Sequence, residues 1–456
     1  MNRSLNVCLL AAIAAMYALP TLAEDAPVTP PPPATLLEAI TTGKPMISFR
    51  LRYENVDQDG KADNANAWTL RNLVGWQTAP FNHFSIAAQL INVTQLNDQF
   101  YDNTNTVFGH ATPPDKVKFP VVADPDYTGV NQLFLEWSGL PDSKVRVGRQ
   151  SVKLDNVRFI GNVEFRQVMQ VFDGIAFENK SITDTEIYLA HFGHVNQITT
   201  ARRSGNIDIA HASWKYSPTE SLTGYGYFED MARNGQNLTV FPPNPKSPYS
   251  GTTLSDNSNR TLGLRADGSH KINDDWKVPY TAEYAKQDDY RGGNSLIDAY
   301  YWRLGAGAGW QSWYLRLDRE MLSSNDGKYG FQTPFGTNHL FQGWADLFLV
   351  TPKQGIEDTY LSFGGKVFDV QLMGEYHWFY SDKDFKTTGG SLNGNQYGKE
   401  LDLSAAYAYD KHWTGKLEYF KFQEDDCYVG TGSCTNTNTS RKRDTDKFLF
   451  TMLYTF

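Results

Sequence analysis

Charged side chains recur at every second position inside otherwise apolar segments of this chain. One run carries Arg50, Arg52 and Glu54, and a later run carries Arg316, Asp318 and Glu320. A guanidinium group stays charged at any working pH and can hold a carboxylate through two hydrogen bonds. Such groups, repeated along one face of a strand, would attract an anionic solute. Single arginines occupy equivalent places in other segments, at Arg71, Arg146, Arg265 and Arg303.

Other chemistry-bearing residues form no comparable set. His191 and His194 are three positions apart, so on a strand they would face opposite sides and could not chelate one metal ion. The acidic turn around Gly60 resembles part of a calcium loop but lacks the closing bidentate acid. No serine, histidine and acid can be assembled into a hydrolytic triad from the nine histidines. We therefore expect no metal site, no cofactor and no catalytic residue.

Residues 444–456 indicate which element positions the charges. On a strand, Lys447, Thr451 and Thr455 would share one face, and the other face would be apolar along its whole length. An amphipathic edge strand of a soluble sandwich is one interpretation. The pattern also resembles the last strand of bacterial outer-membrane barrels, which implies recognition by the barrel-assembly machinery through Phe456. The alternating apolar residues are Phe448, Phe450, Met452, Tyr454 and Phe456.

Composition favours the barrel. The 456 residues include 25 Tyr, 27 Phe and 11 Trp, yet the mean hydropathy is −0.48. No apolar run after residue 23 approaches the roughly 20 residues that a membrane helix needs. Alternating strands turn half of their residues away from lipid, so a barrel can be hydrophilic on average and still span a bilayer. The fold class that follows is all-β, a transmembrane antiparallel β-barrel, with outer-membrane lipid as its surroundings.

The N-terminal 45 residues precede the barrel. Residues 1–23 are typical of a secretory signal, with Arg3 as the charge, an apolar stretch over 7–19 and a small-residue cleavage site at 21–23. Residues 24–45 form a proline-rich segment expected in the periplasm, with a short helix possible over 34–40. The barrel is expected over 46–456.

Charge and cysteine content agree with secretion. Loss of Arg3 takes the formal net charge from −9 to −10, which gives no reason to expect a nucleic-acid partner. Only Cys427 and Cys434 remain after the signal, with six residues between them in a polar stretch. This spacing suits a local disulfide in an oxidising compartment.

The alternation predicts eighteen strands, and the connections between them sort by length. Turns of about two to four residues alternate with long loops, and both ends of the barrel segment fall on the short-turn side, which is the layout of an outer-membrane barrel. The predicted strands are 46–56, 66–78, 83–96, 128–138, 143–151, 166–178, 183–195, 206–216, 221–230, 257–268, 275–288, 298–309, 312–321, 356–366, 369–381, 398–409, 413–424 and 444–456.

The alternation also assigns faces. A charge on the lipid face near the midplane costs roughly 2–4 kcal/mol for Arg or Lys, so charged residues within strands should face the lumen. Residues 166–178 do not alternate cleanly, and we expect a bulge near Asp173. A barrel of this size needs a constriction, for which the two longest loops, 97–127 and 322–355, are candidates. The second loop holds His339, Trp344 and Asp346 and is too aromatic to be freely solvated; packing on the inner wall or capping the outside are both open.

Several stretches resemble the alginate-export family of outer-membrane porins. They are Gly148-Arg149-Gln150, residues 154–162 from Leu154 to Asn162, Arg166-Gln167, Phe172-Asp173-Gly174, and Phe331-Gln-Thr-Pro with His339 and the Gly343-to-Asp346 stretch. Together with Arg52-Tyr53-Glu54 and Asp57 to Gly60, the resemblance covers about residues 46–456.

The resemblance implies a porin that passes an anionic polysaccharide through an arginine-lined constriction. It carries over Arg71, Arg146, Arg149, Arg158, Arg166 and Arg316 as selectivity residues, with Asp155 and Asp173 as their ion-pair partners. We expect a monomer in the bacterial outer membrane that passes an alginate-like polysaccharide or related uronate, and that periplasmic polysaccharide-export proteins could serve as partners. A general or small-organic-anion porin and an outer-membrane hydrolase are the alternatives.

Overall fold

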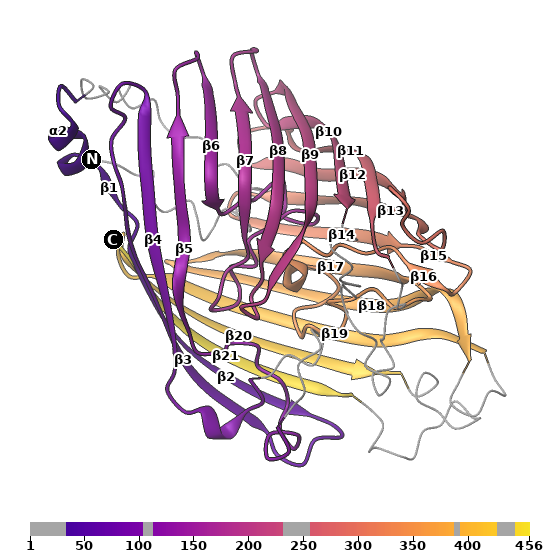
Figure 1. Cartoon of the computed structure of the whole chain (residues 1–456). Coiled ribbons are helices and arrows are strands. Elements are labelled where there is room, and N and C mark those ends of the chain that lie inside the picture. Colours follow the sequence, from indigo (N-terminus) through magenta and orange to yellow (C-terminus); the bar gives the residue numbers. More distant parts are fainter. Residues whose placement is uncertain (1–32, 104–112, 231–255, 387–392, 426–442) are drawn as a thin grey trace.

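The barrel is closed by hydrogen bonds between its first and last strands. The computed structural model describes residues 33–103, 113–230, 256–386, 393–425 and 443–456. Eighteen antiparallel strands form the wall, and β2 pairs with β21 from Ser48 with Thr455 to Gln58 with Thr445. The fold class predicted from the alternation is therefore confirmed (Figure 1).

The wall strands follow one another around the barrel in chain order. They are β2 (Ser48–Gln58), β3 (Ala65–Gln77), β4 (Phe84–Gln95), β5 (Tyr127–Trp137), β6 (Ser143–Gln150), β7 (Val171–Asn179), β8 (Thr185–Asn196), β9 (Arg202–Ser217), β10 (Glu220–Asp230), β11 (Asn259–Lys271), β12 (Trp276–Asp289), β13 (Asp298–Trp310), β14 (Trp313–Leu322), β17 (Ile356–Val367), β18 (Val370–Lys386), β19 (Asn393–Ala408), β20 (Trp413–Glu424) and β21 (Thr445–Thr455).

Small elements lie outside the wall or inside its loops. The helix α2 (Leu36–Thr41) begins at Thr35, whose side chain accepts a hydrogen bond from the Glu38 amide, and β1 (Lys44–Pro45) pairs with the end of β3. The loops carry the one-turn helices η1 (Asp98–Phe100) and η3 (Asn338–Leu340) and the short hairpin of β15 (Ser324–Asn325) and β16 (Tyr329–Gly330). The expected signal and both cysteines, Cys427 and Cys434, lie outside the described residues. No described helix has the length and apolar character needed to cross a membrane.

The predicted faces hold along the strands. In β14, Leu315 and Leu317 are 52% and 55% exposed, whereas Arg316 and Asp318 between them are 3% and 1% exposed. The same alternation buries Arg50 and Arg52 in β2. Exposed tryptophans lie near strand ends, as an aromatic belt at a membrane interface requires. They are Trp68, Trp76, Trp214, Trp276, Trp310, Trp313 and Trp413.

One predicted strand begins too early. Residues 166–170 were assigned to a strand, but β7 begins only at Val171, and the Gln170 amide donates to the Asn162 carbonyl at 2.7 Å. These residues belong to a loop, and all five are buried because the loop packs between the wall and a second loop. The bulge expected near Asp173 is confirmed, since the pairing of β7 with β8 shifts between Asp173 and Gly174.

Two long loops fold into the barrel and pack on each other. Residues 323–355 bury Phe331, Phe335 and Phe348 against wall side chains, which confirms packing on the inner wall rather than outside. Residues 151–170 lie beside them, with Ile160 bridged to Phe335 and the Gly161 amide donating to the Phe335 carbonyl at 2.8 Å. The wall partners include Tyr301, Phe379, Phe420 and Phe422.

We expect Leu317→Arg to destabilise the folded barrel by roughly 2–4 kcal/mol, because it places a charge on the lipid face of β14. Leu317→Phe, which stays apolar, is the control. Urea unfolding in lipid vesicles measures both. Equal stability of the two variants would contradict the assignment of faces.

Candidate functional site

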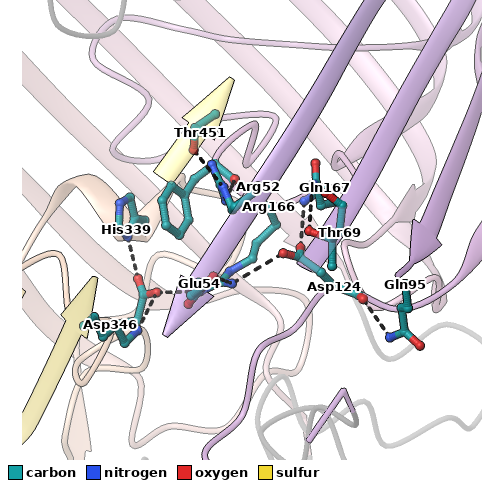
Figure 2. A network of polar contacts seen from close by, with 12 residues as sticks. Arg52, Glu54, Thr69, Gln95, Asp124, Arg166, Gln167, His339, Asp346 and Thr451 are labelled. Atoms are coloured by element: carbon teal, nitrogen blue, oxygen red, sulfur yellow. Dashed lines mark hydrogen bonds and ion pairs between the residues drawn. The ribbon is translucent and has the colours of Figure 1, made fainter. Parts of the chain in front are cut away.

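Arg166 lies at the centre of an ionic network between the wall and three loops. Its guanidinium is 3.0 Å from Glu54 of β2 and 2.9 Å from Asp346 of the 323–355 loop. Asp124, in the loop that follows β4, lies 3.8 Å from it. Asp346 also contacts Lys447 of β21 at 3.3 Å. One side chain thereby joins loops far apart in sequence (Figure 2).

The charges of this network fix the protonation of its loop residues. Burial disfavours the ionised Asp346, but Lys447, His339 and Arg166 outweigh burial and hold the pKa of this carboxyl well below its usual range. Burial lowers the pKa of His339 below its ordinary value, although Asp346 opposes the shift. The pKa of Arg166 is raised despite burial by Glu54, Asp124 and Asp346. Asp346 is therefore held as a carboxylate against Arg166 and Lys447.

Three arginines on β2 and β3 have a different environment. Arg50 pairs directly across the strands with Arg71, and Arg52 lies two residues further along β2. Arg50 donates to the Gln167 side chain at 2.8 Å and to the Glu164 carbonyl at 2.7 Å, and Arg52 donates to the Phe165 carbonyl at 2.5 Å. These acceptors are neutral, so the charges of Arg50 and Arg52 are not cancelled by contact with acids.

Arg71 is the most isolated of the three. Its side chain is fully buried, and within the described structure none of its guanidinium nitrogens has a hydrogen-bond partner. Glu164 supplies the nearest compensation: burial raises the pKa of Glu164, but Arg71, Lys153 and Arg50 outweigh burial and lower it overall. We call Arg50, Arg52 and Arg71 the arginine cluster.

Arg203 of β9 is also buried without a described hydrogen-bond partner, but most other arginines on the inner wall are paired with acids. Arg303 and Arg316 share Asp318, at 3.0 Å and 2.5 Å. Arg265 lies 2.7 Å from Asp267 and 3.4 Å from Glu283. These pairs cancel much of the charge that the sequence places on the wall.

Two further arginines reach the interior by different routes. Arg146 contacts Glu136 at 2.6 Å and keeps 32% of its side chain exposed. Arg158, in the 151–170 loop, is fully buried 3.0 Å from Glu320 and lies over the Phe341 ring.

Two expected pathway residues lie elsewhere. The register puts Arg149 and Asp173 on the same face as Val147 and Ile175, which are exposed apolar residues, so this pair faces outward near the ends of β6 and β7. The alternation through Gly148 sets this face, and Arg149 forms two hydrogen bonds with Asp173. Asp155 also departs from expectation, because its carboxylate contacts His211 at 3.0 Å.

The expected constriction residues come together. His339 stacks on Phe165 with ring centroids 3.3 Å apart and contacts Asp346 at 2.8 Å. Trp344 packs edge-on against Phe420 of β20. The 323–355 loop therefore contacts both the 151–170 loop and the wall.

Some site residues were not identified from the sequence. Asp124 and Gln167 form a hydrogen bond at 2.7 Å, and Gln167 in turn bonds Thr69 at 2.8 Å, yet both come from loops whose sequence has no periodicity to orient them. Arg203 was assigned to a loop but lies in β9, buried, over the Phe335 ring. Of these residues, only Arg203 could have been placed on the inner face from the sequence, by starting the predicted strand 206–216 a few residues earlier.

Replacing Arg166 with methionine should lower the free energy of unfolding by about 3–5 kcal/mol, since the change leaves buried carboxylates without their shared counter-ion. Lys180→Met, which breaks an exposed ion pair with Glu178, should cost less than about 1 kcal/mol. Denaturant titration, with limited proteolysis of the inner loops, measures both. Unchanged stability and protease resistance of Arg166→Met would count against an anchoring role.

Comparison with known proteins places this architecture. A family described as "Alginate export" matches residues 47–440. Among solved structures, Pseudomonas aeruginosa OpdL has a TM-score of 0.64 at 12% identity, covering 91% of this chain and 99% of its own. Pseudomonas aeruginosa OpdQ has a TM-score of 0.63 at 15% identity, covering 92% and 99%.

A third structure, Pseudomonas aeruginosa OpdK with vanillate, has a TM-score of 0.61 at 11% identity and covers 90% of this chain and 97% of its own. No curated protein sequence matches the chain. At these identities the structural neighbours show the fold, and the family match covers most of the barrel. The closed barrel with loops inside it thus belongs to a bacterial outer-membrane porin, and the chain is a member of the alginate-export family.

Proposed function

We propose that this porin passes a hydrophilic solute bearing carboxylate groups, an alginate-like polysaccharide or related uronate, past a constriction whose arginines select for anions. The observation that carries the proposal is the arginine cluster. Three guanidinium groups lie on neighbouring strands at the level of the inner loops, with two of them bonded to neutral acceptors and Arg71 unbonded within the described structure.

The arginine cluster acts through its field rather than by contact. Arg71 is covered by the 151–170 loop, so a passing solute would not touch it. A unit charge about 10 Å away still contributes roughly 0.4 kcal/mol even at the dielectric constant of water, and more beside a protein wall. Three such charges would enrich anions in the lumen, and Arg146, partly exposed, would offer a contact site.

Charge segregation around the wall supports selection rather than bracing alone. The positive surplus lies on β2 and β3, whereas β17 to β19 carry Asp358, Glu375, Glu400 and Asp402. If the arginines only braced the barrel, each would be expected to face an acid, as Arg316 faces Asp318. A cluster of three arginines with Glu164 as the nearest acid costs folding free energy, which a role in passing anions would explain.

A small organic anion is the second candidate solute. The OpdK structure, which shares this fold, is titled as a complex with vanillate. Vanillate and uronates both carry a carboxylate, so the same arginines would serve either. The site gives no support to a hydrolase. The described hydrogen bonds of histidine rings run to carboxylates or a backbone carbonyl, and none of them runs to a serine hydroxyl that could act as a nucleophile.

The solute would pass through a barrel that is complete as a single chain. Closure of β2 on β21 leaves no strand edge that needs a partner, so we propose a monomer. Assembly is proposed to depend on the terminal strand that ends at Phe456. Docking of periplasmic export proteins on the short turns is also proposed for the polysaccharide case.

Arg71→Met tests the proposal in planar bilayers. The anion-to-cation permeability ratio of the refolded protein should fall roughly twofold or more at low salt, because one charge of the arginine cluster is lost. Arg71 has no described hydrogen-bond acceptor to lose, and Glu164 keeps Lys153 and Arg50 as counter-charges, so the variant should still fold. Arg149→Met is the matched control, because it removes an arginine from the outward face and should leave the ratio unchanged.

The same bilayers identify the solute class. Block of the current by polyuronate but not by neutral oligosaccharide supports the saccharide pathway, and block by simple organic acids alone supports the small-anion alternative. Selection by the arginine cluster would be refuted if none of the three solutes blocks a weakly selective current and the anion-to-cation permeability ratio is the same for Arg71→Met and the wild type.

A further inference from the structure

A group of acids surrounds one histidine on the inner wall. The group carries negative charge, whereas the arginine cluster carries positive charge. Glu375 and His377 share the inner face of β18, Asp402 and Glu400 stand directly across from them on β19, and Asp358 lies on β17. His377 is 2% exposed, Asp402 and Asp358 are fully buried, and Glu400 is 1% exposed. We call these five residues the His377 cluster.

The His377 ring is oriented by one of these acids. Its Nδ1 contacts both carboxylate oxygens of Asp358, at 2.9 and 3.0 Å, and the ring stacks on Tyr360. An Nδ1–H that donates to a carboxylate leaves Nε2 as the lone-pair nitrogen. A histidine that binds a metal ion is held by this same kind of carboxylate contact on its other nitrogen.

The free side of the ring faces two carboxylates. Nε2 lies 3.4 Å from Glu375 Oε2 and 3.5 Å from Asp402 Oδ2, and the candidate ligand atoms of these three residues lie within 4.8 Å of one another. A tetrahedral ion with bonds of about 2.0–2.2 Å requires ligand atoms roughly 3.3–3.6 Å apart. The two measured separations from Nε2 fall in that range.

Three buried polar atoms at this place have no hydrogen-bond partner in the described structure. They are His377 Nε2, Asp402 Oδ1 and Glu400 Oε2. A buried carboxylate oxygen or imidazole nitrogen without a partner is costly and calls for a ligand. The unpartnered atoms are therefore a second observation, separate from the spacing of the acids.

Charge balance calls for a cation. All described ion pairs of Asp358, Glu375 and Asp402 run to His377, so even a protonated ring would neutralise only one of the carboxylates. On β20 the residues opposite Asp402 and Glu400 are Phe420 and Phe422, which contribute no charge. Among the described contacts, the inner loop contributes the amides of Ala345, which donates to Glu400 at 2.6 Å, and of Trp344, which donates to Asp402 at 3.3 Å. The charge of Lys447 also acts on Glu400, but its described ion pair is with Asp346.

We propose that the His377 cluster binds one divalent transition-metal cation of the Zn²⁺ class, with His377, Glu375 and Asp402 as ligands and Asp358 orienting the imidazole. Imidazole with carboxylates suits such ions better than Ca²⁺ or Mg²⁺, which prefer oxygen ligands alone. Glu400 adds negative charge beside the ligands. Because the amides of Trp344 and Ala345 contact the same acids, the cation also fastens the 323–355 loop to the wall.

Calorimetric titration of the refolded full-length protein with ZnCl₂, after removal of metal with a chelator, tests the site. The wild type should bind one Zn²⁺ per chain, and His377→Gln and Asp402→Asn should each bind it at least ten-fold more weakly. His211→Gln is the matched control, because His211 is also buried and paired with a single carboxylate, that of Asp155. It should bind as the wild type does.

Folding of each variant is checked by the faster gel mobility of the unheated barrel. A second measurement needs only the wild type: Co²⁺ should give the visible absorption of a four- or five-coordinate ion, which Zn²⁺ then abolishes. Equal Zn²⁺ binding by His377→Gln, Asp402→Asn and the wild type would overturn the proposal. So would a wild type that binds neither metal, because protons would then neutralise the acids.

Discussion

Hydrogen-bond satisfaction of the backbone in lipid is the constraint on which this structure depends. A strand in a bilayer can leave no amide or carbonyl unpaired, so the sheet must close, and here β2 meets β21 along eleven paired residues from Ser48 to Gln58. Closure then divides every strand into a lipid face and an inner face. The charged residues have only the inner face available, which is why arginines and acids gather there at high density.

The charges on the inner face are balanced by ion pairs within the wall and by contacts with the inner loops. Arg303 and Arg316 share Asp318 within the wall, whereas Arg166 extends from a loop to acids on β2 and on a second loop. Loop backbone also takes part, since carbonyls at 164 and 165 accept from Arg50 and Arg52. The loops thus supply hydrogen-bond acceptors and counter-ions to the charged side chains of the wall. What remains uncompensated is local, positive on β2 and β3 and negative on β17 to β19.

The wall could be predicted from the sequence and much of the interior could not. Alternation with period two is a local signal, so Arg50 or Leu317 could be assigned a face from its neighbours alone. Strand register is not local, and the meeting of Glu375, His377 and Asp402 depends on how β18 pairs with β19. The sequence suggested no metal site for this reason. Only Glu375 is close to His377 in sequence, and the other acids of the cluster come from neighbouring strands.

Loops are the second part of the structure that the sequence predicted poorly. Residues 166–170 are all buried although they form no strand, because one side meets the wall and the other a loop, and no local pattern separates such a buried loop from a strand. Arg149 was placed in the pathway by family resemblance, but the pairing of β6 with β5 and β7 turns it outward. For 323–355 the sequence predicted that so aromatic a loop needs a surface but not which one, and the structure shows that the inner wall supplies it.

The bridge between Ile160 and Phe335 has a consequence for how such channels can diversify. The two inner loops share backbone hydrogen bonds, from Gly161 to Phe335 and from Thr337 to Val157, in addition to their side-chain packing. They therefore form one insert with two attachment points, although about 150 residues of barrel separate them in sequence. Grafting either loop alone onto a related barrel would leave unpaired backbone groups inside it. The two loops must therefore change together, since a change in one restricts which sequences the other can hold.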